Sequence, residues 1–168
     1  MTQKLRAGII GSGVFGGYHA GKYTASDLVT LTAIYDVNGA AADALAAKHG
    51  ATGFDALGPF LDAVDIVTIA SPAASHFSNA SRALAAGKSV LIEKPISQTP
   101  GEAQILIKLA RENGLTLAIG HQERLVFQAM GLYDLPERPT RIEASRMGAW
   151  NIRGSDVSVT MDLLIHDA

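Results

Sequence analysis

Residues 5–16 read LRAGIIGSGVFG, an apolar run that passes directly into a glycine-rich segment. The run 5–10 is typical of a buried strand, and residues 11–16 match the pattern G-x-G-x-x-G. A helix-like stretch, residues 14–23, follows at once. This order of strand, glycine turn and helix is the context that the pattern requires, so the segment predicts a dinucleotide-binding unit.

The glycines of this segment have separate expected roles. Gly11 permits a tight turn, Gly13 lets the backbone approach a pyrophosphate, and Gly16 lets the helix pack closely on the strand. The N-terminus of the helix would present the positive end of its dipole to the phosphates. The predicted cofactor-binding residues here are Gly11, Ser12, Gly13, Val14, Phe15 and Gly16.

Asp36 follows the second predicted strand, residues 30–35, about 20 residues beyond the glycine segment. A carboxylate at this place accepts hydrogen bonds from the hydroxyls of the adenosine ribose and repels a 2′-phosphate. We therefore expect NAD as the cofactor, with NADP less favoured.

Short apolar runs alternate with longer helical patterns over residues 1–121. The expected strands are 5–10, 30–35, 52–54, 65–70, 89–93 and 115–119, and the expected helices are 14–23, 38–49, a turn near 60, 75–86 and 99–113. Asn38 is a plausible N-cap, and Thr99 to Glu102 has the form of a capping box. Six strands separated by helices predict an α/β domain with a doubly wound parallel sheet.

The pattern changes in residues 122–168, which we interpret as the start of a second α/β domain for the substrate. Residues 135–139 resemble a loop, residues 141–147 alternate like a half-exposed strand, and residues 159–167 look helical. The helical pattern is cut off at Ala168, so we expect that the remainder of this domain is missing.

Composition excludes several classes of protein. The 168 residues include no cysteine, which removes disulfides, thiolate metal sites and cysteine nucleophiles, and no metal site is expected. The net charge is −2 without a basic run, which argues against a nucleic-acid partner. No signal peptide and no apolar stretch of roughly 18–20 residues is present, so we expect a cytoplasmic protein that is not in a membrane.

Two turns that follow strands carry polar candidates at the edge where such sheets bind ligands. Ser71-Pro72 follows the fourth strand, with His76 one helical turn later, and Glu93-Lys94 follows the fifth strand. His76 is a candidate cofactor contact, although a helical histidine is more often a packing residue. A lysine beside a cofactor crevice can donate to a reacting oxygen, but it can equally be a solvated side chain. His19 and His49 are interpreted as packing or surface residues.

Asp162 and His166 stand four residues apart in the last helical pattern, hence on one face. A carboxylate one turn from an imidazole can orient it for general acid–base work near neutral pH. On spacing alone an ion pair on a helix surface is the commoner outcome.

Together these motifs resemble the glucose–fructose oxidoreductase, inositol dehydrogenase and MocA (Gfo/Idh/MocA) family of nicotinamide-dependent sugar oxidoreductases. The matching segments are Gly11–Gly16, Asp36, Ser71-Pro72 with His76, Glu93-Lys94-Pro95, Gly120–Arg124 and Asp162 with His166-Asp167. The resemblance implies a Rossmann domain followed by a domain with an open, mostly antiparallel sheet. That sheet would build the pocket for a sugar-like substrate and, in the full-length protein, a homo-oligomer interface.

The resemblance also implies roles for single residues. Lys94 would contact the substrate hydroxyl, His166 would be the general base, and Asp162 would orient His166 or bind a neighbouring hydroxyl. The implied cofactor contacts outside the glycine segment are Asp36, Ser71, Pro72, His76, Glu93, Lys94 and Gln122. Gln122 stands where the family often has Asn.

Three functions remain open from the sequence. The first is an NAD-dependent dehydrogenase for a secondary alcohol of a sugar, cyclitol or nucleotide-sugar. The second is a related two-domain reductase of another substrate class, and the third is a non-catalytic dinucleotide-binding regulator of the same fold. The joint presence of Lys94, Asp162 and His166 favours the first.

Overall fold

The computed structural model describes residues 4–137, 139–143 and 145. The chain forms two compact units, Met1–Ile119 and Gly120–Ala168. The strands are β1 Leu5–Ile10, β2 Val29–Tyr35, β3 Thr52–Phe54, β4 Ile66–Ile69, β5 Ser89–Glu93 and β6 Leu117–Gly120. The helices are α1 Val14–Thr24, α2 Gly39–His49, α3 Leu57–Asp62, the short 3-10 helix η1 Ala73–Ser75, α4 His76–Ala85, α5 Pro100–Glu112 and α6 Gln122–Ala129.

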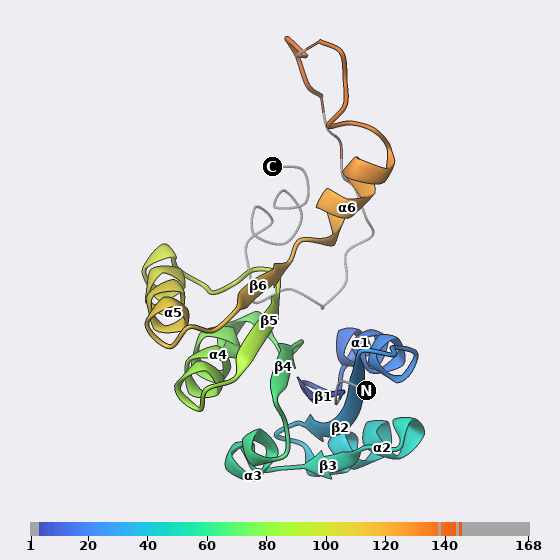
Figure 1. Cartoon of the computed structure of the whole chain (residues 1–168), viewed down its shortest axis with the longest axis vertical. Helices are drawn as coiled ribbons and strands as arrows, with labels where there is room; N and C mark the ends of the chain where they lie inside the picture. The colour runs from blue at the N-terminus through green and yellow to red at the C-terminus, as the bar shows by residue number, and fades with distance from the viewer. Residues whose placement is uncertain (1–3, 138, 144, 146–168) are drawn as a thin grey trace. The chain divides into compact units, whose positions relative to one another are not determined.

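The six strands form one sheet in the order β3-β2-β1-β4-β5-β6 (Figure 1). β1 pairs in parallel with both β2 and β4, so the strand order reverses between these two neighbours. In sheets of this kind, ligands bind at the carboxyl ends of the strands where the order reverses. The predicted doubly wound α/β fold is confirmed, and the glycine turn after β1 lies at this switch point.

Neighbouring residues of a strand point to opposite faces, and both faces of this sheet are covered by helices. Ile9 and Ile34 pack with Ala20 of α1 and Ala46 of α2. Ile10 and Ile69 belong instead to the larger core that includes the buried side chains of α3, α4 and α5. The strands are thus buried on both sides, as expected for a parallel sheet.

The predicted helix ends are also confirmed. The Asn38 side chain accepts a hydrogen bond from the backbone N–H of Ala41 at 3.3 Å, and Gly50 ends α2 with a φ of 69°. Thr99 and Glu102 form both hydrogen bonds of a capping box at the start of α5. Local residue chemistry therefore sets these boundaries.

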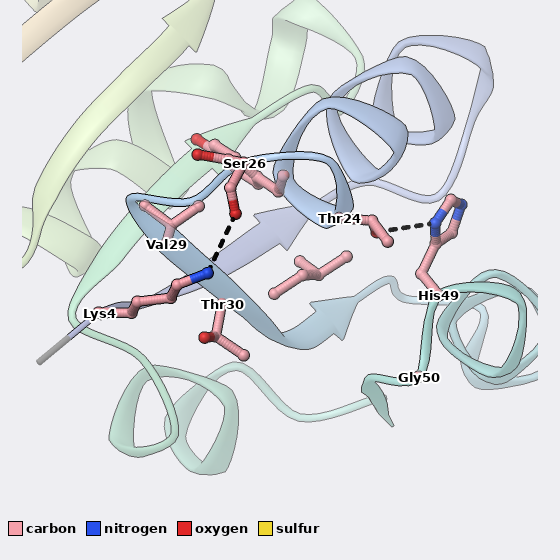
Figure 2. Close-up of a pocket in the computed structure, with 9 residues that line it drawn as sticks. Lys4, Thr24, Ser26, Val29, Thr30, His49 and Gly50 are labelled. Carbon is pink, nitrogen blue, oxygen red and sulfur yellow. Dashed lines mark hydrogen bonds between the residues drawn. The ribbon is translucent and has the colours of Figure 1, made fainter.

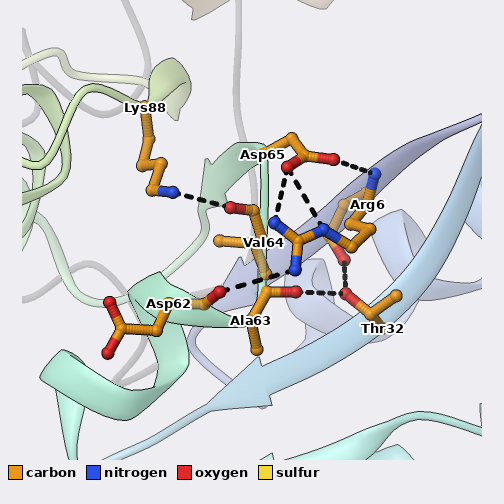
Figure 3. Close-up of polar contacts among 8 residues, drawn as sticks. Arg6, Thr32, Asp62, Ala63, Val64, Asp65 and Lys88 are labelled. Atoms are coloured by element: carbon orange, nitrogen blue, oxygen red, sulfur yellow. Dashed lines mark hydrogen bonds and ion pairs between the residues drawn. The ribbon is translucent and has the colours of Figure 1, made fainter.

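The amino ends of β1 and β4 are joined by polar contacts (Figure 3). The Arg6 guanidinium donates to Asp65 Oδ1 at 2.7 Å, and the backbone N–H of Arg6 donates to Asp65 Oδ2 at 2.8 Å. Hydrogen bonding with Arg6 lowers the pKa of Asp65, and the same bond raises the pKa of Arg6. Lys88 donates to the Val64 carbonyl at 2.8 Å, so the loop before β4 is held from a second side.

The second unit differs from expectation. Residues 122–129 form α6, a helix that the sequence pattern did not indicate, and its Leu125 and Val126 are exposed. None of the residues of α6 is buried in the described unit. The expected strand over 141–147 is not formed at residues 141–143 or at Ser145. The expected helix at 159–167 lies outside the described residues.

Candidate active site

The glycine segment adopts the geometry that its sequence predicts. Gly11 has a φ of +102°, and a Cβ there would lie 2.7 Å from the backbone of Ala70. A Cβ on Gly16 would overlap with the carbonyl oxygen of Gly11. Glycine at position 11 therefore lets the turn after β1 approach the end of β4, and glycine at position 16 lets α1 approach that turn.

Gly13 differs from the other two glycines of the segment. A Cβ at Gly13 would meet no atom within 4 Å, so the space in front of the first turn of α1 is open. Gly13 is the N-cap of α1, and as a glycine it has no side chain with which to cap this helix end. Its first N–H groups are thus suitably placed to donate to an anion such as a pyrophosphate.

Asp36 lies beside this segment at the end of β2. Its Oδ2 accepts hydrogen bonds from the Ser12 backbone N–H at 2.8 Å and the Ser12 hydroxyl at 2.6 Å. Its Oδ1 accepts one from the backbone N–H of Asn38 at 2.9 Å. Burial raises the pKa of Asp36, but these bonds outweigh burial, and the pKa lies below its ordinary value. The carboxylate is therefore kept charged and oriented next to the glycine turn.

The turn after β4 is held by hydroxyl groups. Ser71 Oγ lies 2.8 Å from Ser75 Oγ and accepts a hydrogen bond from the Asn79 amide at 3.3 Å. The Ser75 hydroxyl also donates to the Pro72 carbonyl at 2.8 Å. Pro72 is exposed, so this turn presents the Pro72 ring to solvent next to the hydrogen-bonded Ser71.

His76 is buried beneath this turn, with 1% of its surface exposed. Its Nδ1 lies 2.7 Å from the Pro95 carbonyl oxygen, and its Nε2 lies 2.8 Å from the Ser71 carbonyl oxygen. A neutral imidazole has one N–H to donate to these acceptors and an imidazolium has two. The ring of His76 is thus engaged with the main chain of two turns, and its contact with the cofactor stays a prediction.

Glu93 ends β5 and is 9% exposed. Its Oε1 lies 2.8 Å from Nε2 of His19, whose side chain is 20% exposed on α1. Sequence reasoning treated His19 as a packing residue and missed this contact. A signal was present: His19 stands three residues after Gly16, hence on the helix face that meets the sheet.

Lys94 is half-buried between Glu93 and Pro95, and the Lys94–Pro95 peptide bond is cis. The residues of the first unit that were predicted from sequence therefore come together at the carboxyl edge of β1, β2, β4 and β5. Gln122, the first residue of α6, is exposed in the second unit. Asp162 and His166 lie outside the described residues.

A pocket of about 240 Å³ lies elsewhere, beside the amino end of β2 (Figure 2). Lys4 donates to the Ser26 carbonyl at its rim at 3.5 Å, and Thr24 Oγ1 lies 3.1 Å from His49 Nδ1. None of the described residues predicted for the cofactor site lines this pocket. Within the described part of the chain, no helix is long and apolar enough to cross a membrane, and no group of three or more candidate side chains could hold a metal ion.

Comparison with known families supports the geometry. Residues 5–121 match the sequence model of the GFO_IDH_MocA group, described as an oxidoreductase family with an NAD-binding Rossmann fold. The chain is 38% identical over 164 residues to UDP-N-acetylglucosamine 3-dehydrogenase of Acidithiobacillus ferrooxidans, covering 97% of this chain and 52% of that protein. It is 36% identical over 135 residues to D-glucoside 3-dehydrogenase of Escherichia coli, covering 78% and 38%.

Solved structures give the same result. The crystal structure of the Acidithiobacillus ferrooxidans dehydrogenase superposes with a TM-score of 0.89 and 37% identity over 99% of this chain and 55% of that one. GenD2 from gentamicin A biosynthesis, in complex with NAD, gives a TM-score of 0.70 and 36% identity over 73% of this chain and 36% of GenD2. KijD10, a 3-ketoreductase from Actinomadura kijaniata in complex with NADP, gives 0.73 and 30% over 79% and 43%. The chain spans about half the length, or less, of these relatives.

Proposed function

Because the chain belongs to the Gfo/Idh/MocA oxidoreductase family and carries that family's NAD-binding Rossmann domain, we propose that it serves a hydride transfer between NAD and a secondary alcohol of a sugar-like substrate. The predicted family and oxidoreductase class are confirmed by the comparisons. The activity itself belongs to the whole protein and is the subject of the proposal.

The observation that carries the proposal is the open N-terminus of α1 beside the charged Asp36. An added Cβ at Gly13 would meet no atom within 4 Å, which supports a pyrophosphate at this place, and we expect the nearby Asp36 to bind the ribose hydroxyls. The 2′-phosphate of NADP would bring a second negative charge toward this carboxylate. We therefore propose NAD as the preferred cofactor.

The chemistry needs a proton acceptor and a group that stabilises an alkoxide. NAD supplies the acceptor for the hydride that leaves the substrate carbon. The Lys94 ammonium would donate to the substrate oxygen and stabilise its developing negative charge. His166 would take the hydroxyl proton, and Asp162 would orient the imidazole one helical turn away.

The substrate class follows from the named activities of the relatives. UDP-N-acetylglucosamine 3-dehydrogenase and D-glucoside 3-dehydrogenase both act at position 3 of a hexose unit, and KijD10 is a 3-ketoreductase. We propose a glycoside or nucleotide-sugar oxidised at this position as the substrate. A homo-oligomeric full-length protein fits the family resemblance.

The test is to follow NADH absorbance with the full-length protein and a panel of nucleotide-sugars, glycosides and cyclitols. We expect His166→Ala and Lys94→Ala each to lower kcat by roughly 10²–10⁴-fold. The Lys94→Ala variant should keep its Kd for NAD within a few-fold of the parent. Lys108→Ala is the matched control, because Lys108 is an exposed lysine of α5 that pairs with Glu112 at 3.7 Å.

A regulator of the same fold is the second candidate, because the cofactor site alone would suffice for it. Parental kcat in both the His166→Ala and Lys94→Ala variants would contradict the catalytic proposal. NAD binding without turnover of any tested substrate would favour the regulator.

A further inference from the structure

We infer that His19 and His76 are positioning residues that hold the two chain neighbours of Lys94, His19 through the Glu93 side chain and His76 through the Pro95 carbonyl. The inference rests on the proposed function, in which Lys94 acts on the substrate oxygen. Both histidines and their partners are described residues of the first unit, and both lie outside the glycine segment.

The first anchor acts on the residue before Lys94. His19 Nε2 lies 2.8 Å from Glu93 Oε1, and the two side chains are 20% and 12% exposed. A hydrogen bond between a carboxylate and a largely buried imidazole is stronger than one between exposed groups, because water competes less with it. The Glu93 side chain is therefore bound to α1 rather than directed toward solvent.

The second anchor acts on the residue after Lys94. His76 Nδ1 lies 2.7 Å from the Pro95 carbonyl oxygen, and the imidazole is 1% exposed. The same ring reaches the Ser71 carbonyl at 2.8 Å with its Nε2. One side chain of α4 thus joins the turn after β4 to the turn that contains Lys94.

The two anchors leave the direction of the Lys94 side chain with little freedom at its base. Glu93 ends β5 and Pro95 follows Lys94, so a bond to the Glu93 side chain and one to the Pro95 carbonyl limit the movement of the Lys94 backbone between them. A misplacement of about 1 Å at a reacting group can cost roughly 10²-fold in rate. The need to place the Lys94 ammonium accurately would explain why two histidine rings hold its neighbours.

The two histidines also connect the neighbours of Lys94 to the elements that would hold the cofactor. His19 lies on α1, the helix that begins at the glycine segment, and His76 starts α4, directly after the turn at Ser71. A shift of either helix would move the lysine with it. The lysine and the cofactor would thus keep their relative positions.

Isosteric variants separate the two bonds of His76. The amide nitrogen of Asn occupies roughly the place of Nδ1, whereas that of Gln occupies roughly the place of Nε2. His76→Asn should therefore keep the Pro95 bond, and His76→Gln should keep only the Ser71 bond. We expect kcat to stay within a few-fold of the parent for His76→Asn and to fall by about 10- to 100-fold for His76→Gln.

His19 allows an independent test. His19→Gln places an amide N–H near Glu93 and should restore kcat to within a few-fold, whereas His19→Leu removes the bond and should lower kcat by about 10-fold or more. Both His19 variants should keep the Kd for NAD within a few-fold of the parent, because His19 is not among the residues predicted to contact the cofactor. His49→Leu is the matched control, because His49 is a half-buried histidine of α2 that is hydrogen-bonded to Thr24 and lies outside the predicted site.

A second readout needs no turnover. The rate of acetylation of Lys94, measured by mass spectrometry relative to the exposed Lys108, should be slowed by NAD in the parent, in His76→Asn and in His19→Gln. This protection should be reduced at least about threefold in His76→Gln and His19→Leu, while circular dichroism and NAD titration establish that each variant is folded.

The outcomes distinguish the two proposals. Equal kcat and equal NAD protection in the Asn and Gln variants of His76, together with parental values for His19→Leu, would overturn the positioning role. Parental kcat in Lys94→Ala would instead overturn the proposed catalytic function, and the acetylation assay would still decide whether the histidines hold the lysine. A parallel loss of NAD affinity and kcat would also contradict positioning, because it would indicate a general structural role.

Discussion

The glycine segment and the Lys94 turn lie at the same edge of one sheet but are built in different ways. Residues 11–16 are shaped by the backbone itself, through a positive φ at Gly11 and a close approach at Gly16. The turn at Lys94 is held by side chains from two helices, and the bonds span 74 residues for His19–Glu93 and 19 for His76–Pro95. The glycine segment depends on the absence of side chains at Gly11 and Gly16. The Lys94 turn depends on the side chains of His19 and His76.

This difference predicts how each region responds to mutation. A backbone-defined turn fails when a side chain is added, because the neighbouring atoms are main chain and cannot rotate away. A turn held by side chains should instead lose accuracy while the fold persists, because its anchors can be removed singly. The following predictions test this contrast, beginning with the largest expected effect.

The largest effect is expected from Gly16→Ala. The new methyl group would overlap with the Gly11 carbonyl oxygen, so the helix must move away from the strand. We expect the free energy of unfolding to fall by about 1–3 kcal/mol or more, and NAD binding to weaken with it. Chemical denaturation and calorimetric NAD titration measure the two quantities.

Two other glycines are matched controls. Gly13→Ala meets no atom within 4 Å, so it should leave stability at or slightly above the parental value and weaken only NAD binding. Gly21→Ala lies in α1 with open space around it and should stabilise the protein by about 0.5–1 kcal/mol. Equal stability losses in Gly13→Ala and Gly16→Ala would contradict the separate roles of the two glycines.

The next effect concerns the choice between NAD and NADP. We expect Asp36→Ala to weaken NAD binding by about 1–3 kcal/mol, because it removes a charged acceptor for the ribose hydroxyls. NADP should lose less or gain, because the repulsion of its 2′-phosphate disappears as well. Calorimetric titration of both cofactors measures the gap, and equal or reversed affinities in the parent would refute the assignment of Asp36.

The smallest effect is on stability in acid. The pKa values of Asp36 and Asp65 are both lowered in the folded protein, so both carboxylates stabilise the fold at neutral pH. This stabilisation is lost as the pH falls below the ordinary carboxylate range toward the folded pKa, because the folded protein then binds protons less readily than the unfolded chain. Asp36→Asn and Asp65→Asn should each flatten the acid side of the stability curve, measured by denaturation between neutral pH and about pH 3.

Salt separates these two carboxylates. Asp65 is bonded to the charged, exposed Arg6, whereas the donors of Asp36 are a neutral hydroxyl and backbone N–H groups. Screening acts over roughly 8–10 Å at moderate ionic strength and should weaken mainly the Asp65 contribution. An Asp36 contribution that disappears in salt before that of Asp65 would be inconsistent with these contacts.

Much of the first unit was predictable because its signals are local. The cap at Asn38, the capping box at Thr99 and the positive-φ glycine at position 50 are each decided within a few residues. The glycine segment was found for the same reason, since it belongs to one strand–turn–helix unit, and Asp36 was found because it directly follows the next strand. These are the parts of the site that the structure places as expected.

The remainder depends on contacts between distant segments. No local pattern pairs His19 with Glu93 or His76 with Pro95, because the sheet brings these segments together. The helix α6 was missed because it has only eight residues, and none of them is buried in the described unit. Asp162 and His166 remain predictions.

The bonds that hold Glu93 and Pro95 have a consequence for the evolution of this site. Neither bond uses the side chain of residue 94, so a substitution there would leave both in place. Residue 94 can therefore be replaced while the turn keeps its position at the carboxyl edge of the sheet. During evolution, a different side chain at position 94 would not require changes in the residues that hold the turn. In protein design, the same position is suitable for introducing an acid, a base or a bulky group.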